Sequence, residues 1–296
     1  MKETLDKFLI QIEMMNLNIS SGKPALKKPL CLLLLISKFE NKIIIKNKIR
    51  FIELEKELGE LILSFGARPN KSGPKPNQPF QYMNSSAFWE IHLPNGVEMT
   101  HKRDLSLKVL RDSETYVTLD QDIFEMLNIS REFRATATEF ILKKWWPETI
   151  QEEILLSLSL PVYFPISTRP PRNKEFAEKV LSNFRYRCAI CGFNATFNKS
   201  HFGLDGAHIK WFSQRGPDIV NNGLSLCKIH HWAFDKGAIT IDPKNLTIEV
   251  SPLFVGRDHQ SIEIIESFNG REIFPFKEKM PDARYLDWHY EHIFMH

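Results

Sequence analysis

The stretch from Cys188 to Asp235 constrains the fold most, because it holds two pairs of metal-binding side chains. Cys188 and Cys191 form a Cys-x-x-Cys pair, and Cys227 with His230 forms a Cys-x-x-His pair farther along the chain. Three thiolates and one imidazole in two such pairs suit a closed tetrahedral Zn²⁺ site. We therefore expect a structural zinc that ties the first pair to the start of a helix.

Three more polar residues lie near these ligands without being needed by the zinc, namely His208, Asn222 and His231. The pattern predicts a strand over 203–209 that carries His208, a loop that holds Asn222, and a helix or its approach over 224–234. In that arrangement His231 faces the strand, and a single divalent ion could lie between it and a phosphate. This surplus of reactive residues indicates catalysis.

The order of strand histidine, loop asparagine and helix histidine resembles the HNH, or ββα-metal, nuclease family. The resemblance implies that His208 is the general base, that Asn222 orients the site, and that His231 binds a catalytic Mg²⁺, Mn²⁺ or similar ion. A neutral imidazole near its pKa can deprotonate water. The cation stabilises the charge that develops on the phosphorane and on the leaving oxygen.

One position departs from the family pattern, which often has Asp or His directly before the base. This chain has Ala207 there. Asp205 has the same strand parity as Ala207, so it could supply the missing carboxylate to the catalytic metal. Asp235 follows His231 by one helical turn and is either a partner of the site or an ordinary solvated side chain. A zinc knuckle without catalysis is the simpler alternative, but it leaves the additional histidines and the asparagine unexplained.

Length and composition set the broad limits. A chain of 296 residues, of which 43% are hydrophobic, can bury the cores of two domains. The formal net charge is only +3, so a nucleic-acid surface must come from local basic clusters. Three of the four cysteines are assigned to metal, which favours a reducing compartment, and Cys31 in an apolar run is expected to be a buried small hydrophobe.

No membrane contact is expected. The apolar run around Cys31 is shorter than the roughly 20 residues that span a bilayer, and the first residues do not resemble a signal peptide. We therefore expect a cytoplasmic protein. Four prolines between residues 158 and 173 indicate a stiff connection. The predicted organisation is a modified-DNA-binding domain over 1–160, a Pro-rich linker over 161–173, and an HNH endonuclease domain over 174–296.

The first half of the chain predicts helices around a small sheet. Amphipathic helices are expected over 4–15 and 53–65, a buried helix over 30–39, and a basic strand or its lead-in over 42–52. This pattern is consistent with a winged-helix-like DNA-binding module. Together with the ββα-metal half, it predicts an α+β fold.

Basic residues gather between residues 23 and 50, where eight Lys or Arg accompany a single acidic residue, Glu40. A loop rich in Pro, Asn and Lys is expected over 66–80, and a short strand with Phe88 and Trp89 follows it. Charge of one sign beside a Pro- and aromatic-containing loop is typical of a surface that tracks phosphates. A solvated lysine-rich face is the alternative.

The order of these segments resembles the sulfur-binding domain of phosphorothioate-dependent restriction endonucleases. The shared features are Gly-Lys-Pro-Ala-Leu-Lys-Lys-Pro-Leu with the leucines after it, and Gln-Pro-Phe before Phe-Trp-Glu. The family usually has His-Arg where this chain has Lys27 and Lys28, and Tyr-Pro where it has Gln78 and Pro79. The resemblance continues through the nuclease half and covers nearly the whole chain.

This resemblance implies a pocket for sulfur, which is larger and less hydrated than the oxygen it replaces. Pro79, Phe80 and Tyr82 would form an apolar cup, and Lys28 would supply the positive charge. Lys lacks the bidentate fork of Arg. We expect Lys46 to contact a phosphate without distinguishing modified from plain DNA.

We therefore predict a type IV-like, modification-dependent restriction endonuclease. It would recognise phosphorothioated double-stranded DNA and hydrolyse nearby phosphodiester bonds through the HNH site. A nuclease that depends on modified cytosine is the alternative within enzymes, and a non-cleaving zinc-dependent DNA-binding regulator is the alternative outside them. One active site per chain and two strands to cut imply either a homodimer or repeated nicking.

Overall fold

The computed structural model describes residues 2–15, 17, 19–20, 23–24, 26–66, 73–99, 104–161 and 174–296. The chain divides into two compact units. Unit 1 comprises Met1–Trp145 with Glu152–Ile166, and unit 2 comprises Trp146–Gln151 with Ser167–His296. The linker predicted over 161–173 lies almost entirely outside the described residues, so the predicted domain limits stay predictions.

Unit 1 is mainly helical. Its elements are α1 (Lys2–Glu13), β1 (Ile19–Ser20), β2 (Lys23–Pro24), α2 (Lys27–Glu40), α3 (Glu55–Phe65), α4 (Asn77–Tyr82), β3 (Trp89–His92), α5 (Leu107–Leu110), β4 (Tyr116–Leu119), α6 (Gln121–Ile129), α7 (Arg131–Trp145) and α8 (Glu148–Ser157). Short 3-10 turns occur at Phe51–Glu53 and Met83–Ser85. Residues Glu148 to Gln151 of α8 belong to unit 2.

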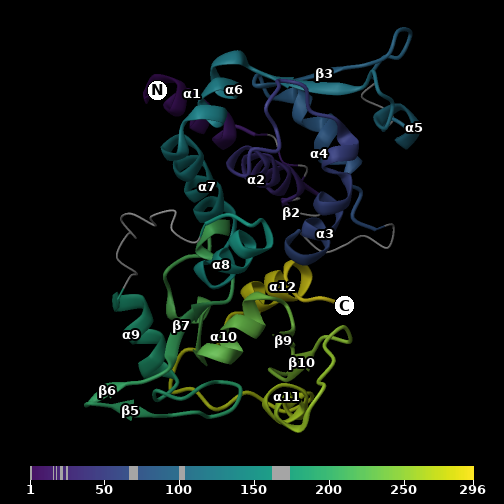
Figure 1. Ribbon diagram of the computed structural model, residues 1–296. Coiled ribbons are helices and arrows are strands. Elements are labelled where there is room, and N and C mark those ends of the chain that lie inside the picture. Colours follow the sequence, from purple (N-terminus) through teal and green to yellow (C-terminus); the bar gives the residue numbers. More distant parts are fainter. Residues whose placement is uncertain are drawn as a thin grey trace. The chain divides into compact units, whose positions relative to one another are not determined.

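Helix α2 forms the centre of unit 1 (Figure 1). The side chains from Leu30 to Ile36, Cys31 among them, are at most 1% exposed. A helix that is apolar on every side has to be covered on every side, and α3, α4, α6 and α7 pack against it. The predicted buried helix over 30–39 and the predicted burial of Cys31 are therefore confirmed.

The segment over 42–52, predicted as a strand or its lead-in, does not form one. The N–H groups of Ile43 and Ile44 donate to the carbonyl oxygen of Lys38, at 2.9 and 3.4 Å, and so complete the last turn of α2. Donors used at a helix end are not available to a strand ladder. Within this segment, Ile49 alone joins the sheet, as an isolated antiparallel bridge to Val117.

Part of the predicted loop over 66–80 is also helical. Residues 67–72 lie outside the described residues, but α4 begins at Asn77 and includes Gln78, Pro79 and Phe80. Proline is tolerated in a first helical turn, where the N–H that it lacks has no partner within the helix. Phe80 is 0% exposed, with its ring edge-to-face on Phe51 and Trp89 at centroid distances of 5.3 and 5.7 Å.

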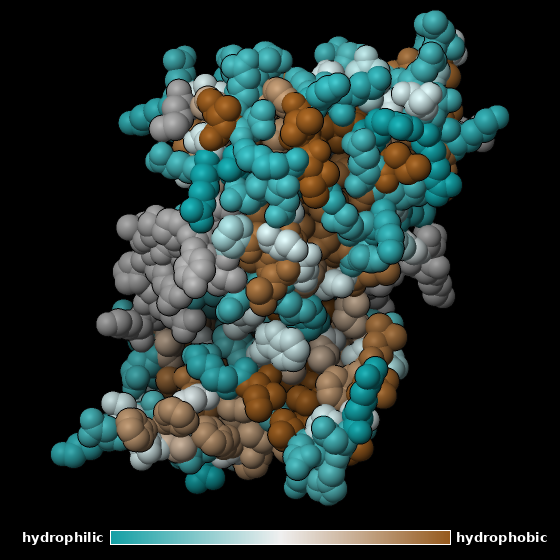
Figure 2. All heavy atoms as spheres, in the orientation of Figure 1, coloured by the Kyte–Doolittle hydropathy of each residue, from teal (hydrophilic) through white to brown (hydrophobic). Residues whose placement is uncertain are grey.

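Helices and short two-stranded sheets are mixed in both units, as an α+β fold requires. The winged-helix-like description of unit 1 stays a prediction. On the face shown in Figure 2, hydrophilic side chains cover most of unit 1, with apolar ones set among them. None of the helices in the described ranges combines the length and the apolar character needed to cross a membrane.

Unit 2 contains α9 (Lys174–Asn183), β5 (Thr196–Phe197), β6 (Ser200–His201), β7 (Leu204–His208), β8 (Gly223–Cys227), α10 (Lys228–Asp235), β9 (Ile239–Ile241), β10 (Ile248–Val250), α11 (His259–Ile264) and α12 (Ala283–His292). Short 3-10 turns occur at Phe212–Gln214, Val220–Asn222 and Glu266–Phe268.

The strands β7 and β8 are antiparallel, with Leu204 opposite Cys227 and His208 opposite Gly223. Helix α10 follows β8 without a gap, and α9 packs on the same pair of strands. This packing needs a glycine in β7, because a Cβ on Gly206 would lie 2.7 Å from Cα of Ala177 in α9. The predicted strand over 203–209 is confirmed. The segment over 224–234 holds the end of a second strand as well as the helix.

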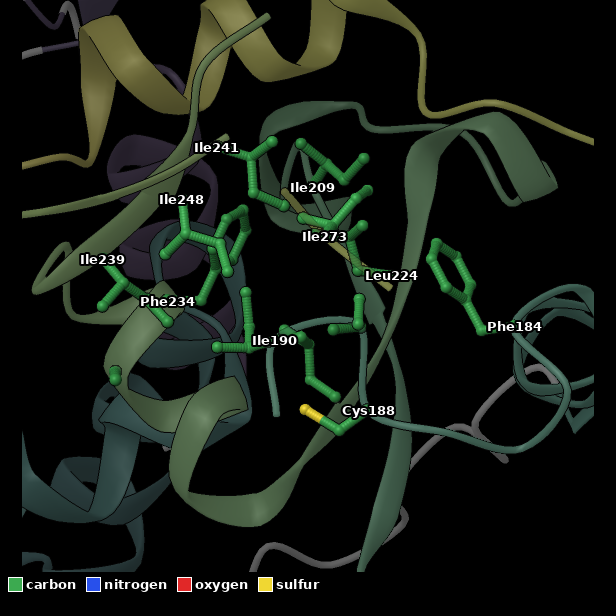
Figure 3. Packing of buried hydrophobic residues seen from close by; sticks show 14 of the residues in the cluster. Phe184, Cys188, Ile190, Ile209, Leu224, Phe234, Ile239, Ile241, Ile248 and Ile273 are labelled. Atoms are coloured by element: carbon green, nitrogen blue, oxygen red, sulfur yellow. The ribbon is translucent and has the colours of Figure 1, made fainter. Parts of the chain in front are cut away.

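The core of unit 2 lies between β8, α10 and the β9–β10 hairpin. Figure 3 shows Phe234 beside Ile239 and Ile248, with Leu224 on the other side of the same cluster; all four are at most 1% exposed. These β-branched and aromatic side chains suit short strands packed on a helix. Cys188 lies in the same buried cluster, which places the first cysteine pair beside the strands and α10.

Candidate metal and catalytic site

The side chains of Cys188, Cys191, Cys227 and His230 converge, and their ligand atoms all lie within 4.8 Å of one another. Sγ of Cys191 and Sγ of Cys227 are 4.0 Å apart, and Sγ of Cys188 is 3.6 Å from Nδ1 of His230. Zn–S bonds of about 2.3 Å at tetrahedral angles imply sulfur–sulfur separations of about 3.8 Å. The set is therefore compatible with zinc.

The orientation of His230 also fits a ligand. Its Nε2 lies 2.8 Å from the carbonyl oxygen of Ile264, to which it can donate. That bond leaves Nδ1, 3.1 Å from Sγ of Cys227, to face the sulfur atoms. A second hydrogen bond of this kind fixes the tautomer and the ring orientation of metal-bound histidines.

His208 lies at the end of β7, where its ring stacks on Phe176 of α9 at a centroid distance of 4.1 Å. Its Nε2 is 2.7 Å from Oδ1 of Asp218. Burial lowers the pKa of His208, although the charge of Asp218 acts in the opposite direction. A neutral imidazole held by one nitrogen is suited to accept a proton at the other.

Asn222 holds the loop between the two strands. It is fully buried, its Oδ1 accepts from the N–H of Lys210 at 2.9 Å, and its Nδ2 donates to the carbonyl oxygens of Lys210 and Pro217 at 3.1 and 3.0 Å. The chain passes so close here that a Cβ on Gly216 would lie 1.8 Å from the carbonyl oxygen of Lys210. Asn222 thus fixes the loop that carries Asp218.

The sequence reasoning missed Asp218. An aspartate ten residues after His208 is a candidate partner for its ring, but spacing alone does not predict the loop conformation that brings the carboxylate to the ring. The contacts of Asn222 and the close packing at Gly216 help to define that conformation.

His231 lies between two carboxylates. Its Nδ1 is 3.0 Å from Oδ2 of Asp205, and its Nε2 is 3.2 Å from Oδ2 of Asp235. Burial alone would lower the pKa of His231, but the charges of Asp235 and Asp205 raise it to about 9. Burial alone would raise the pKa of Asp205, but hydrogen bonds from His231 and Lys228 lower it to about 2.

Asp235 is a partner of the site and not a solvated side chain. It is 3% exposed, and its Oδ1 accepts from Nε1 of Trp211 at 2.9 Å. Its Oδ2 accepts from the hydroxyl of Thr149. The charges of Asp235 and His231 both act on the pKa of His208.

The two carboxylates approach different nitrogens of one imidazole ring. Asp205, His231 and Asp235 therefore do not converge on a point as the zinc set does. Among the described residues, the zinc set is the only group of three or more Cys, His, Asp or Glu side chains whose ligand atoms converge. Ala207, directly before His208, is 1% exposed in the core.

The predicted recognition residues are only partly brought together. Nζ of Lys27 donates to Oε1 of Gln78 at 3.0 Å, and Nε2 of Gln78 donates to Oδ2 of Asp104 at 3.3 Å. The hydroxyl of Tyr82 donates to Oδ1 of Asp104 at 2.6 Å. Gln78 thus connects α4 to the start of α2, and Asp104, which the sequence reasoning missed, ties Gln78 to Tyr82 within α4. Burial lowers the pKa of Lys27.

Two of the three residues predicted to form an apolar cup for sulfur, Pro79 and Phe80, are buried. Phe80 is enclosed by the core and cannot line an open pocket. Tyr82 is 36% exposed. Nζ of Lys28 donates to Oγ of Ser85 at 3.3 Å, and Lys46 is exposed.

Two family descriptions match the chain. The first, "ScoMcrA-like, DNA sulfur-binding domain", matches residues 5–163, and the second, "HNH endonuclease", matches residues 188–242. No curated protein matches.

Similar solved structures include the sulfur-binding domain of SprMcrA complexed with phosphorothioated DNA, at 18% identity and a TM-score of 0.44, covering 53% of this chain and 94% of that one. The corresponding ScoMcrA domain is 16% identical with a TM-score of 0.41, covering 51% and 97%. The modification-dependent TagI restriction endonuclease is 22% identical with a TM-score of 0.29, covering 45% and 41%.

Proposed function

The chain belongs to the family of ScoMcrA-like DNA sulfur-binding domains and carries an HNH endonuclease domain in the same polypeptide, and from these two facts we propose a phosphorothioate-dependent restriction endonuclease. The first domain would select the modified duplex, and the nuclease domain would hydrolyse phosphodiester bonds near it. The observation that carries the proposal is the joining of these two domains in one chain. The nuclease match argues against a non-cleaving regulator.

In the proposed reaction His208 takes the proton of the attacking water. Its Nε2 is held by Asp218, so Nδ1 is the nitrogen that accepts the proton. The charge of Asp218 then stabilises the imidazolium, as a carboxylate paired with a catalytic histidine does. Asn222 acts through the loop, because it keeps Asp218 in reach of the ring.

A divalent ion would be held by His231 and one neighbouring carboxylate. Imidazole and carboxylate donors suit Mg²⁺, Mn²⁺ and related ions, and the ion would supply charge stabilisation at the phosphate. The sequence points to Asp205 as the carboxylate, but both oxygens of Asp205 already accept from Nζ of Lys228, each at 2.8 Å. Asp235 has no lysine or arginine partner among the described residues, and its charge acts on His208.

We therefore assign the ligand role to His231 with Asp235, and we assign to Asp205 the task of holding the other nitrogen of the ring. Exchanging each carboxylate in turn separates the two assignments. Asp235→Ala should weaken activation by Mn²⁺ more than Asp205→Ala does. The opposite order would return the ligand role to Asp205.

For recognition we propose a surface formed by the start of α2 and by α4, with Lys28 as the cation and Tyr82 as the aromatic wall for sulfur. Lys46 would contact a phosphate, and unit 1 would be the winged-helix-like DNA-binding part. Cutting of both strands would need two chains or two successive nicks.

The test of the proposal is plasmid cleavage. Plasmid carrying phosphorothioate linkages and the same plasmid without them are incubated with the protein in Mg²⁺ or Mn²⁺. We expect cutting of the modified plasmid alone. Cutting of a plasmid that carries modified cytosine, with the phosphorothioated one left intact, would replace this proposal by a modified-cytosine nuclease.

A further inference from the structure

Thr149 reaches the proposed metal site from outside the matched nuclease region. It lies at the start of α8, in the segment Trp146–Gln151, which belongs to unit 2. Trp146 and Ile150 in this segment are 2% and 3% exposed, so the segment is anchored on both sides of the threonine. Residue 149 falls within the range matched by the sulfur-binding description, 5–163, and not within 188–242.

The hydroxyl of Thr149 donates to Oδ2 of Asp235, the same oxygen that lies 3.2 Å from Nε2 of His231. The other oxygen, Oδ1, accepts from Nε1 of Trp211 at 2.9 Å. A carboxylate held at one oxygen can still rotate about its Cβ–Cγ bond. Hydrogen bonds from two neutral donors, one to each oxygen, stop that rotation. Because neither donor carries a charge, the negative charge of Asp235 is not neutralised and can act on a metal ion.

We propose that Thr149 is a positioning residue for the catalytic metal site, because it fixes the oxygen of Asp235 that faces His231. The inference rests on the proposed function. It extends the machinery of the HNH site to a residue thirty-nine positions before Cys188, in a segment that no nuclease motif includes. Outer partners of metal ligands typically change metal affinity by about 10- to 100-fold.

The experiment measures Mn²⁺ binding by the full-length, zinc-loaded protein with electron paramagnetic resonance, without DNA. Thr149→Val keeps the size of the side chain and removes the hydroxyl, and Thr149→Ser keeps the hydroxyl. We expect Thr149→Val to weaken Mn²⁺ binding by about tenfold or more, and Thr149→Ser to stay close to the unaltered protein. Thr138→Val is the matched control, since Thr138 is fully buried and its hydroxyl has no hydrogen-bond partner among the described residues.

A double-mutant cycle separates positioning from a general effect on the fold. In an Asp235→Ala background, Thr149→Val should cause no further loss of Mn²⁺ binding, because residues that act through one another are not additive. Unchanged Mn²⁺ affinity in Thr149→Val, or an equal additional loss in the Asp235→Ala background, overturns the role of Thr149. If Thr149→Val loses its zinc or its fold, Thr149→Ser carries the test, and a tenfold loss in that variant also overturns it.

The same data keep the two proposals apart. A protein that binds Mn²⁺ at this site and cuts phosphorothioated DNA, but does not respond to Thr149→Val, refutes the inference alone. If the protein neither binds Mn²⁺ nor cleaves phosphorothioated DNA, the proposed function is refuted, and the positioning role of Thr149 is refuted with it.

Discussion

His230 and His231 are neighbours on α10, yet they belong to sites of different kinds. His230 is 1% exposed and turns its Nδ1 toward three cysteine sulfurs, so that four ligand atoms converge. His231 turns to two carboxylates that approach opposite nitrogens of its ring. Successive helix positions point about 100° apart, which lets one helix serve two sites. The first site is complete within its own ligands, whereas the second depends on residues from several segments.

Loss of the zinc site should have the largest effect. Structural zinc contributes on the order of 10 kcal/mol to the folding of small metal-binding domains, so Cys227→Ala should lose the metal and unfold unit 2. Zinc content per chain and the circular dichroism melting curve measure this. Cys31→Ala, at a buried cysteine outside the site, is the control and should keep its zinc. A Cys227→Ala protein that still holds one zinc per chain would contradict the assignment of Cys227 as a ligand of a closed four-ligand zinc site.

His208→Ala should abolish cleavage without affecting the zinc. Removal of a general base typically lowers the rate by about 10²- to 10⁴-fold, while the folded protein and its zinc content should be retained. Rates on phosphorothioated plasmid and zinc content are measured together. His201→Ala, an exposed histidine of the same unit that stacks on Tyr186, should cut normally. Wild-type cleavage by His208→Ala would remove this residue from the mechanism.

A third histidine gives a prediction for stability against pH. His289 in α12 is 0% exposed; its Nε2 can donate to the carbonyl oxygen of Phe234 at 2.9 Å, and its Nδ1 is 2.8 Å from Oγ1 of Thr240. Burial lowers its pKa from 6.5 to about 4. Between these values the unfolded chain takes up a proton that the folded chain does not, so the free energy of unfolding falls as the pH falls from about 6.5 to about 4.

The expected contribution of His289 to this loss is up to about 3 kcal/mol. Urea unfolding at pH 7, 5.5 and 4 measures it, and His289→Gln should show a flatter pH dependence over the same range. Equal slopes in the two proteins would show that His289 is not the group that titrates.

Asp218→Asn should have the smallest effect. The pair of His208 and Asp218 is partly exposed, with side chains 22% and 28% accessible, so solvent screens it and the expected loss of rate is on the order of tenfold. Because the carboxylate raises the pKa of His208, its removal should move the acid limb of the pH–rate profile to lower pH. Asp287→Asn, at an exposed position of α12, is the control. A shift to higher pH would contradict the assigned role.

Much of the fold could be predicted because the signals are local. Ligand spacing indicated the zinc set, an unbroken apolar run indicated α2, and the spacing of His208, Asn222 and His231 indicated the strand, loop and helix of the site. Each depends on residues that are near one another in sequence or on a family motif. The strand predicted over 42–52 does not form at its start because the N–H groups of Ile43 and Ile44 donate to the end of α2 and are not available to a ladder.

The amino-acid sequence by itself determined which residue types are available for zinc, base and helix ligand. The tertiary structure alone decided which partners complete them. Asn222 holds the loop that places Asp218 beside His208. Thr149 donates to Asp235 from a distant segment, and Phe80 is buried in the core and does not line a pocket. The physical reason is that a loop conformation and the packing of separate segments depend on contacts in three dimensions, which neither periodicity nor spacing in the sequence predicts.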